Sequence, residues 1–318
     1  MRTAMVVATD DPVILGYWLR NYEIFVAPAV DELMLAINGP HADEVEVSAS
    51  KARIFRYPRA NDHGWCLEQM YPQSQGDVLF FTETDAWLRR PGILDGWYST
   101  VESGEADVVG SPRHPASQEL VRAAETRWGE IDCGEDHGTG FLPCFVTASR
   151  EALDRTDRLF GARQYPAGTE IPGLHITSAE LTTDETFVGL SWQLRDTGAR
   201  VQLIPQHRVA RGTSSHPDSA DYFHVGSLST ALGMAWGSVA SEEGFHRTPS
   251  GEMARRLALW QIIAAESPPS ERRDVFADTL AGLVSRLALP PEIIDYWRDY
   301  YAPWFRRADD PSKSITEP

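Results

Sequence analysis

The 318-residue chain, 42% hydrophobic and 24% charged, has the composition of a globular protein and the length for one large domain with an appendage or for two modest domains. Its formal net charge of −17 argues against a general nucleic-acid-binding face, because phosphate backbones would repel it, as would anionic lipid surfaces. The three cysteines form no C-x-x-C pair, which argues against a disulfide framework and a cysteine zinc site.

The chain shows no sign of export or of membrane insertion. No apolar run reaches the roughly 18 residues that a membrane span needs. Residues 1–11 hold one Arg and a short apolar run before two aspartates, unlike a secretory signal. We therefore expect a cytoplasmic protein with reduced thiols and no membrane span.

The first half of the chain alternates short apolar runs with polar turns and one amphipathic helix. Residues 4–8 and 33–37 are continuous apolar runs, typical of strands that are buried on both faces. Between them, apolar residues spaced by three or four predict a helix that starts at Pro12 and ends before Pro28. Further strands are predicted at residues 54–57, 77–82 and 108–110, with the strongest signal at 77–82.

The next part of the chain is less regular. Residues 112–180 are rich in Gly, Pro and His and predict long loops, which in α/β domains tend to carry binding sites, with a helix near 149–159. A helix over 185–197 and a returning strand over 201–204 follow. Because strands alternate with helices, we expect an α/β fold with a mostly parallel sheet that is flanked by helices on both faces.

The pattern changes near residue 250. Three apolar stripes with helical spacing, separated by Pro-Pro pairs, predict a helical appendage over 251–307 behind a main domain of residues 1–250. A flexible polar tail is expected over 308–318. The third stripe is dense in aromatic side chains, which pack either on the main domain and the sister helices or on a substrate or a second copy of the chain.

Two carboxylates follow the strongest predicted strand. Glu83 and Asp85 lie two positions apart, and alternate residues of an extended segment point the same way, so both can face one ion. The ligand crevice of an open α/β sheet lies beyond the carboxyl ends of its strands, where these residues are expected. Two carboxylates suit Mg²⁺ or Mn²⁺, and such an ion would neutralise a diphosphate. A solvated acidic turn is the alternative.

Over roughly residues 1–230, this layout resembles the GT-A fold of nucleotide-sugar glycosyltransferases. Their Asp-x-Asp motif follows an apolar strand and holds the metal ion and the nucleotide diphosphate. Here Glu83 stands at the first position of that motif and Asp85 matches the last. The resemblance implies a GT-A-like, Rossmann-related sheet, a nucleotide-sugar donor, bound Mn²⁺ or Mg²⁺ and a hydroxyl acceptor.

The resemblance also implies further donor contacts. The family's first nucleotide contact follows its N-terminal strand, where this chain has Thr9 and Asp10. A polar, Gly-containing stretch ahead of the motif corresponds to Arg59, Asn61 and Gly64. Aromatic residues in this number are more often core than ligand contacts, but three tryptophans are candidates for stacking on sugar or base rings: Trp65, Trp87 and Trp97.

Two later motifs complete the resemblance. Asp184 and Glu185 match the family's late acidic motif, whose carboxylate deprotonates the acceptor hydroxyl in inverting members; Asp184 is our first choice for the base and Glu185 the second. A helix N-cap with an acidic first turn is the alternative. His224 matches a histidine that completes the family's metal shell or touches the diphosphate, and a half-buried structural histidine is the alternative there.

Two other function classes stay open. A sugar nucleotidyltransferase shares the sheet order and the acidic metal site, but it would be expected to have a Gly-rich loop with Arg or Lys after the first strand, where residues 9–12 are acidic and lack glycine. A non-catalytic binding or scaffold protein could keep the fold, and the Glu in place of the first Asp is compatible with that. Asp85, Asp184 and His224 together argue instead for a glycosyltransferase. We expect inversion, and retention is the alternative.

Overall fold

The computed structural model describes residues 1–10, 12–59, 61–84, 86–88, 91–113, 118–129, 140–184, 186–204 and 222–224. All of these residues belong to one compact unit of the chain. The appendage expected over 251–307 and the tail over 308–318 lie outside the described residues, so the division into domains stays a prediction. Within the described ranges, no helix is long and apolar enough to cross a membrane.

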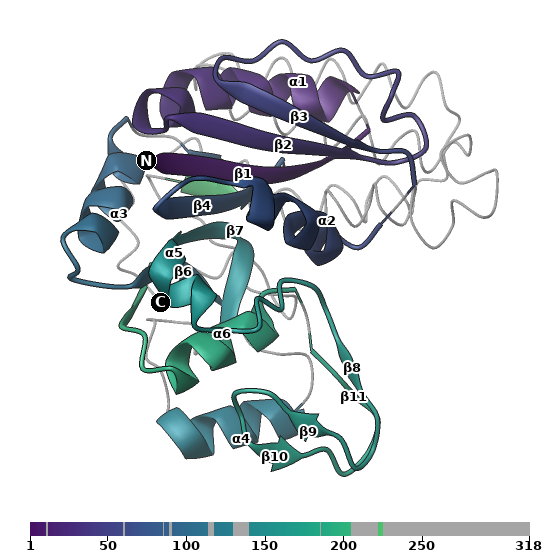
Figure 1. Ribbon diagram of the computed structural model, residues 1–318, viewed down its shortest axis with the longest axis vertical. Helices are drawn as coiled ribbons and strands as arrows, with labels where there is room; N and C mark the ends of the chain where they lie inside the picture. Colours follow the sequence, from purple (N-terminus) through teal and green to yellow (C-terminus); the bar gives the residue numbers. More distant parts are fainter. Residues whose placement is uncertain are drawn as a thin grey trace, which may run out of the picture. The chain divides into compact units, whose positions relative to one another are not determined.

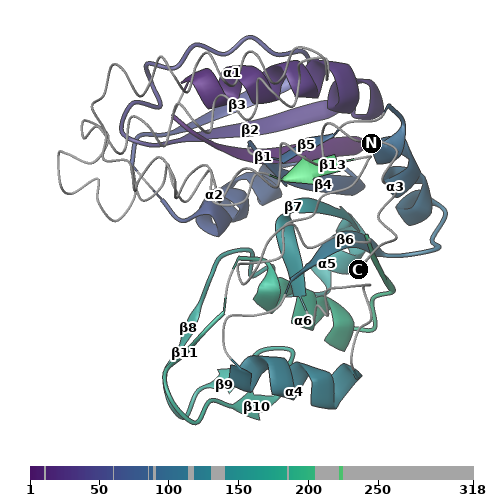
Figure 2. The same cartoon turned by 180° about the vertical axis from the view of Figure 1, so that it is seen from behind.

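The central sheet of this unit has seven strands in the order β12-β6-β7-β4-β1-β2-β3 (Figures 1 and 2). The strands are β1 (Arg2–Thr9), β2 (Glu32–Asn38), β3 (Ala52–Tyr57), β4 (Val78–Glu83), β6 (Val108–Arg113), β7 (Gly140–Ser149) and β12 (Val201–Leu203). β7 runs antiparallel to β4 and β6, and the other neighbouring pairs of this sheet are parallel. The predicted α/β class with a mostly parallel sheet is confirmed.

Helices cover both faces of the sheet. On one face, buried side chains of β1, β2 and β4 pack against α2 (His63–Met70), α5 (Arg150–Asp154) and α6 (Val188–Asp196). On the other face, the Trp97 ring of α3 (Ile93–Glu102) lies 6.1 Å from Phe80 and 6.0 Å from Phe145, measured between ring centroids. Two further helices are α1 (Pro12–Asn21) and α4 (Gln118–Trp128). Burial on both faces explains why the strands read as continuous apolar runs.

The strands predicted from these runs are confirmed, because each overlaps an observed strand of the sheet. The predictions for the helices were less accurate. The helix expected over 149–159 is only the short α5, which ends before Arg158 takes a left-handed φ of +57°. The helix expected from 185 begins at Val188, because Phe187 has a φ of +69°.

The prediction of long loops over 112–180 was wrong in part, since this stretch contains α4 and β7. β7 includes a glycine at its start and a proline, Pro143, in its interior, which weaken a strand signal. β7 pairs with β4 and β6, which are distant in the sequence, so no local sequence pattern predicts this pairing.

Among the described residues, three two-stranded sheets accompany the main sheet. β8 (Gln164–Tyr165) pairs with β11 (Thr182–Thr183), and β9 (Glu170–Ile171) pairs with β10 (Ile176–Thr177). β5 (Ala86–Leu88) follows the Glu83–Asp85 motif and pairs antiparallel with β13 (Tyr222–His224). The β5–β13 ribbon joins segments far apart in the sequence and contains Trp87 and His224, which the sequence analysis selected, and β11 directly precedes Asp184.

Candidate functional site

The carboxyl ends of the parallel strands meet at one edge of the sheet. Thr9, the last residue of β1, is paired with Asn38 at the end of β2, and Asn38 with Tyr57 at the end of β3. Glu83, the last residue of β4, is level with Val7 of β1. Thr9 and Glu83, which the sequence selected separately, therefore lie at the same sheet edge, as the strand-end rule predicts.

Glu83 contacts a histidine that the sequence analysis did not select. Its Oε1 lies 2.9 Å from Nδ1 of His63, the first residue of α2. Both side chains are mostly withdrawn from solvent, at 21% exposure for His63 and 16% for Glu83. The sequence did contain a signal for the start of this helix, because Asp62, directly before His63, is of a residue type that often caps helix N-termini. Its carboxylate accepts a hydrogen bond from the Trp65 backbone N–H at 3.2 Å.

The start of α2 is held by close backbone packing at Gly64. A Cβ added to Gly64 would lie 2.0 Å from both the Cα and the backbone nitrogen of Gly161. No flexible side-chain end can move aside, since the contacting atoms are backbone. Gly64 was selected as part of a donor-binding stretch, and in the structure its lack of a side chain lets α2 begin beside Glu83.

We expect Gly64→Ala to destabilise the protein by ~2–3 kcal/mol, because overpacking against backbone outweighs the helix propensity that alanine adds. Gly96→Ala in α3 is the matched control, because a Cβ there meets nothing within 4 Å. It should stabilise by about 0.5–1 kcal/mol. Urea denaturation of both variants measures the difference, and equal effects would show that the Gly64 contact is unimportant.

Asn61 and Arg59 lie in the loop that leads from β3 to α2. The Asn61 backbone N–H donates to Asn38 Oδ1 at 3.0 Å, and Asn38 Nδ2 donates to the Asn61 carbonyl at 2.9 Å. The Asn61 side chain also donates to the Arg59 carbonyl at 2.8 Å. These bonds attach the loop to the end of β2, and they leave the exposed Arg59 side chain on a fixed backbone.

Asp10 follows β1 and is 2% exposed. Its Oδ2 accepts a hydrogen bond from the His41 backbone N–H at 2.7 Å. Gly39 approaches the same carboxylate so closely that a Cβ there would lie 2.4 Å from Asp10 Oδ2, and its φ of +152° favours glycine. Asp10 thus joins the end of β1 to the loop after β2, while the neighbouring Thr9 is half-buried.

His224 is brought next to the acidic motif by the β5–β13 ribbon. In that ribbon His224 is the direct partner of Ala86, the residue that follows Asp85. Residues directly opposite in an antiparallel pair have Cα atoms about 4.5–5.5 Å apart. The His224 side chain and all of Asp85 lie outside the described part of the structure, as does Glu185.

Asp184 is 1% exposed, and both of its carboxylate oxygens accept hydrogen bonds. The Tyr165 hydroxyl donates to Oδ2 at 2.7 Å, and the Arg163 backbone N–H donates to Oδ1 at 2.5 Å. Burial, together with the Asp184 charge, raises the pKa of Tyr165 well above its usual value, so this hydroxyl stays protonated. The N-cap alternative for Asp184 is wrong, because α6 begins at Val188 and its N-cap position is Phe187.

The donor set expected for a divalent cation is Glu83, Asp85 and His224. The chemistry fits, since carboxylate and imidazole suit Mn²⁺ and a carboxylate suits Mg²⁺. Glu83 stands at the end of β4, and the His224 backbone lies beside the residue after Asp85. Among the side chains that the structure describes, no three His, Cys, Asp or Glu residues gather closely enough to hold a metal ion.

The tryptophans differ in their surroundings. Trp87 and Trp97 are 6% and 8% exposed and belong to the core. Trp65 is 39% exposed, and its ring meets the Tyr57 ring edge-on, with centroids 5.1 Å apart. Since Tyr57 ends β3 and Trp65 lies in the first turn of α2, this aromatic pair borders the sheet edge that carries Thr9 and Glu83.

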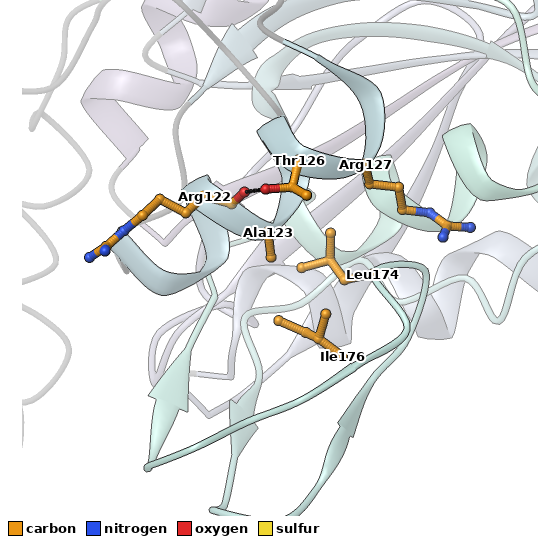
Figure 3. Close-up of a pocket in the computed structure, with 6 residues that line it drawn as sticks. All are labelled: Arg122, Ala123, Thr126, Arg127, Leu174 and Ile176. Atoms are coloured by element: carbon orange, nitrogen blue, oxygen red, sulfur yellow. Dashed lines mark hydrogen bonds between the residues drawn. The ribbon is translucent and has the colours of Figure 1, made fainter.

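A separate surface hollow of about 470 Å³ lies beside α4, and none of the residues selected above lines it (Figure 3). It is lined by Arg122, Ala123, Thr126, Arg127, Leu174 and Ile176. The apolar side chains face one another, whereas both arginines extend away to either side. Arg127 is paired with Asp196. The hollow is therefore the margin of the small apolar cluster under α4, not a part of the strand-end site.

No protein-family model and no curated protein matches the chain. Solved structures do. A mannosyltransferase from Pyrobaculum calidifontis, in complex with GDP-Man and Mn²⁺, is 12% identical over 98% of this chain and 88% of its own, with a TM-score of 0.41.

Two mycobacterial structures align over less of the chain. Glucosyl-3-phosphoglycerate synthase from Mycobacterium tuberculosis, with Mn²⁺ and UDP-glucose, is 16% identical over 49% of this chain and 58% of its own, with a TM-score of 0.35. A mycobacterial protein is 18% identical over 55% of this chain and 59% of its own, with a TM-score of 0.33. The solved structures to which this chain is similar thus include glycosyltransferases, the family that its sequence resembles.

Proposed function

We propose that this protein is a glycosyltransferase that binds a nucleotide-diphosphate sugar with the help of Mn²⁺ or Mg²⁺ and transfers the sugar to a hydroxyl acceptor, with inversion. The pairing of His224 with Ala86 carries the proposal. It joins a late histidine to an acidic motif at the carboxyl end of a central strand, although the two segments are far apart in the sequence. If the acidic motif were only a solvated turn, nothing would favour its pairing with so distant a segment.

Each group at the sheet edge has a role in donor binding. Glu83, Asp85 and His224 would hold the cation, which would neutralise the charge that develops on the departing diphosphate. The exposed Arg59 guanidinium can bind phosphate oxygens, and Thr9 can donate a hydrogen bond to the nucleoside. Asp10 holds the loop after β2 through the His41 N–H, and Asn61 holds the loop between β3 and α2 through Asn38. Their contribution is to keep these two loops in position.

The base that takes the acceptor proton is proposed to lie at Asp184 or Glu185. A general base must come within hydrogen-bond reach of the hydroxyl that it deprotonates. Asp184 is buried and accepts from both Tyr165 and the Arg163 N–H, which favours Glu185 as the base and Asp184 as the anchor of the segment. This reverses the order in which the sequence analysis ranked the two.

A thermal-shift screen of nucleotides and nucleotide sugars, with and without Mn²⁺, tests the function. A ligand at 100 times its Kd adds about 2.7 kcal/mol, which corresponds to a rise in Tm of roughly 4 °C for a chain of 318 residues. We expect such a rise for a UDP or GDP sugar only when Mn²⁺ is present. The absence of any metal-dependent rise would contradict the proposal. Release of pyrophosphate instead of a nucleoside diphosphate would identify a nucleotidyltransferase.

A further inference from the structure

We infer that the indole of Trp65, held in place by Tyr57, is the surface on which the nucleobase of the donor stacks. The inference rests on the proposed function, because it takes the ligand at the sheet edge to be a nucleotide sugar. Trp65, Tyr57 and Arg59, on which it depends, all lie in the described part of the chain.

Trp65 is an exposed aromatic side chain at the strand-end edge. Among the residues that the structure describes, four large hydrophobic side chains are exposed: Met1, Ile24, Trp65 and Leu181. Trp65 is the aromatic member of this set, with 39% of its surface exposed. Contact between water and an indole ring is unfavourable, so a flat apolar partner that covers the ring gains free energy.

The packing of α2 does not require an indole at this position. Leu67 and Met70 lie on the buried side of the helix. Trp65 lies on the opposite side, with the exposed Gln69 one turn further along. The N-cap Asp62 accepts from the Trp65 backbone N–H and does not use its side chain. A polar residue would serve the helix equally well, so the tryptophan indicates a contact outside the helix.

Tyr57 fixes the orientation of the indole. The two rings meet at 73° with their centroids 5.1 Å apart, an edge-to-face arrangement that aromatic pairs prefer. Tyr57 itself packs against the main core cluster, and the hydrogen bond to Asp62 fixes the Trp65 backbone. A ring that is already ordered loses little conformational entropy when a ligand stacks on it.

The surroundings of the aromatic pair suit a nucleotide. Thr9, Asn38 and Tyr57 are level with one another at the ends of β1, β2 and β3. Because neighbouring strands lie ~4.8 Å apart, Thr9 and Tyr57 are roughly 10 Å apart along this edge. The exposed Arg59 stands in the loop between Tyr57 and Trp65. Stacking surfaces combined with cationic groups bind bases together with their phosphates, and this edge offers both.

Substitutions at Trp65 separate stacking from other contacts. Trp65→Ala removes the ring, Trp65→Phe keeps an aromatic face, and Trp65→Leu keeps apolar bulk without one. Ile24→Ala is the matched control, because Ile24 is 61% exposed in η1 (Tyr22–Val26). The Tyr22 hydroxyl donates to the Ser50 carbonyl just ahead of β3, so η1 lies near the opposite ends of the strands.

Calorimetric titrations with UDP, GDP, ADP, dTDP and inorganic pyrophosphate, all with Mn²⁺ present, provide the main readouts. Titrations with UDP-glucose and GDP-mannose complete them. For the nucleoside diphosphate that the wild type binds most tightly, we expect Trp65→Ala and Trp65→Leu to lose roughly 5–100-fold in affinity, the usual loss for one stacked base. Trp65→Phe and Ile24→Ala should stay within about threefold of the wild type.

Two further measurements show that such a loss comes from the base. Pyrophosphate has no base, so its affinity should be the same in all variants. The Tm of each ligand-free variant should lie within about 3 °C of the wild type, because one aromatic pair contributes little to the stability of a chain of this size.

Four results would overturn the inference. A Trp65→Ala variant that binds the nucleotide like the wild type shows that the base does not stack on Trp65. Equal losses for nucleotide and pyrophosphate assign the effect to the phosphates or the fold. Equal affinities of Trp65→Leu and Trp65→Phe assign it to apolar contact alone. A loss for the nucleotide sugar but not for its nucleoside diphosphate assigns Trp65 to the sugar. A wild-type protein that binds none of these nucleotides refutes instead the proposed function itself.

Discussion

Asp85→Ala is expected to abolish Mn²⁺-dependent donor binding and to leave the Tm of the metal-free protein unchanged. The substitution removes the second carboxylate of the proposed metal site, and with it a full negative charge next to a divalent cation. A charged residue two positions beyond Glu83, the last residue of β4, is not expected to contribute to core packing. Calorimetry with a UDP or GDP sugar and Mn²⁺ measures the effect.

His224→Ala should weaken the same binding less, since it removes a neutral ligand and not a charge. Glu151→Ala is the matched control for net charge, because Glu151 is exposed on α5. α5 follows Ser149, which pairs with Val78 at the start of β4, so Glu151 lies near the opposite edge of the sheet. Donor affinity that is lowered equally by Asp85→Ala and Glu151→Ala would reveal an effect of overall charge and refute the metal site.

Glu185→Gln is expected to leave donor binding intact and to lower the rate of sugar transfer by about 100-fold or more, the usual loss when a general base is removed. Transfer rates at saturating donor and acceptor, together with calorimetric donor affinity, measure the two effects separately. A Glu185→Gln variant with a normal transfer rate would exclude Glu185 as the base.

Asp184→Asn separates the two neighbours. If Asp184 is an anchor, the substitution removes an acceptor from a buried pair of hydrogen bonds and should destabilise the protein by ~1–3 kcal/mol. Tyr165→Phe is the matched variant, because it removes the donor to Oδ2 and leaves the carboxylate in place. We expect both variants to lose stability and to keep transfer within about tenfold. Loss of transfer in Asp184→Asn at unchanged stability would restore Asp184 as the base.

The arrangement of the sheet could be predicted from the sequence because its strands are buried on both faces. Continuous apolar runs such as 33–37 and 77–82 are local signals, and β2 and β4 follow from them directly. The position of Glu83 at a strand end follows from the same signal, because the apolar run stops there. α4 and β7 could not be predicted in this way: α4 is a mostly polar helix, and β7 is stabilised by its two distant neighbours.

Within the candidate site, the sequence by itself determined which residue types stand where, and the tertiary structure decided which of them meet. The runs of apolar residues place Thr9 and Glu83 at strand ends, and the parallel register brings those ends to one edge. The partners of these residues depend on long-range contacts: His63 reaches Glu83 through the packing of α2, and His224 reaches Ala86 through an antiparallel ribbon. Burial of Asp184 against Tyr165 likewise depends on the β8–β11 pairing. A local pattern reports a residue's own conformation and not the neighbours that folding brings to it, so only the structure shows that Asp184 is buried and accepts hydrogen bonds at both carboxylate oxygens.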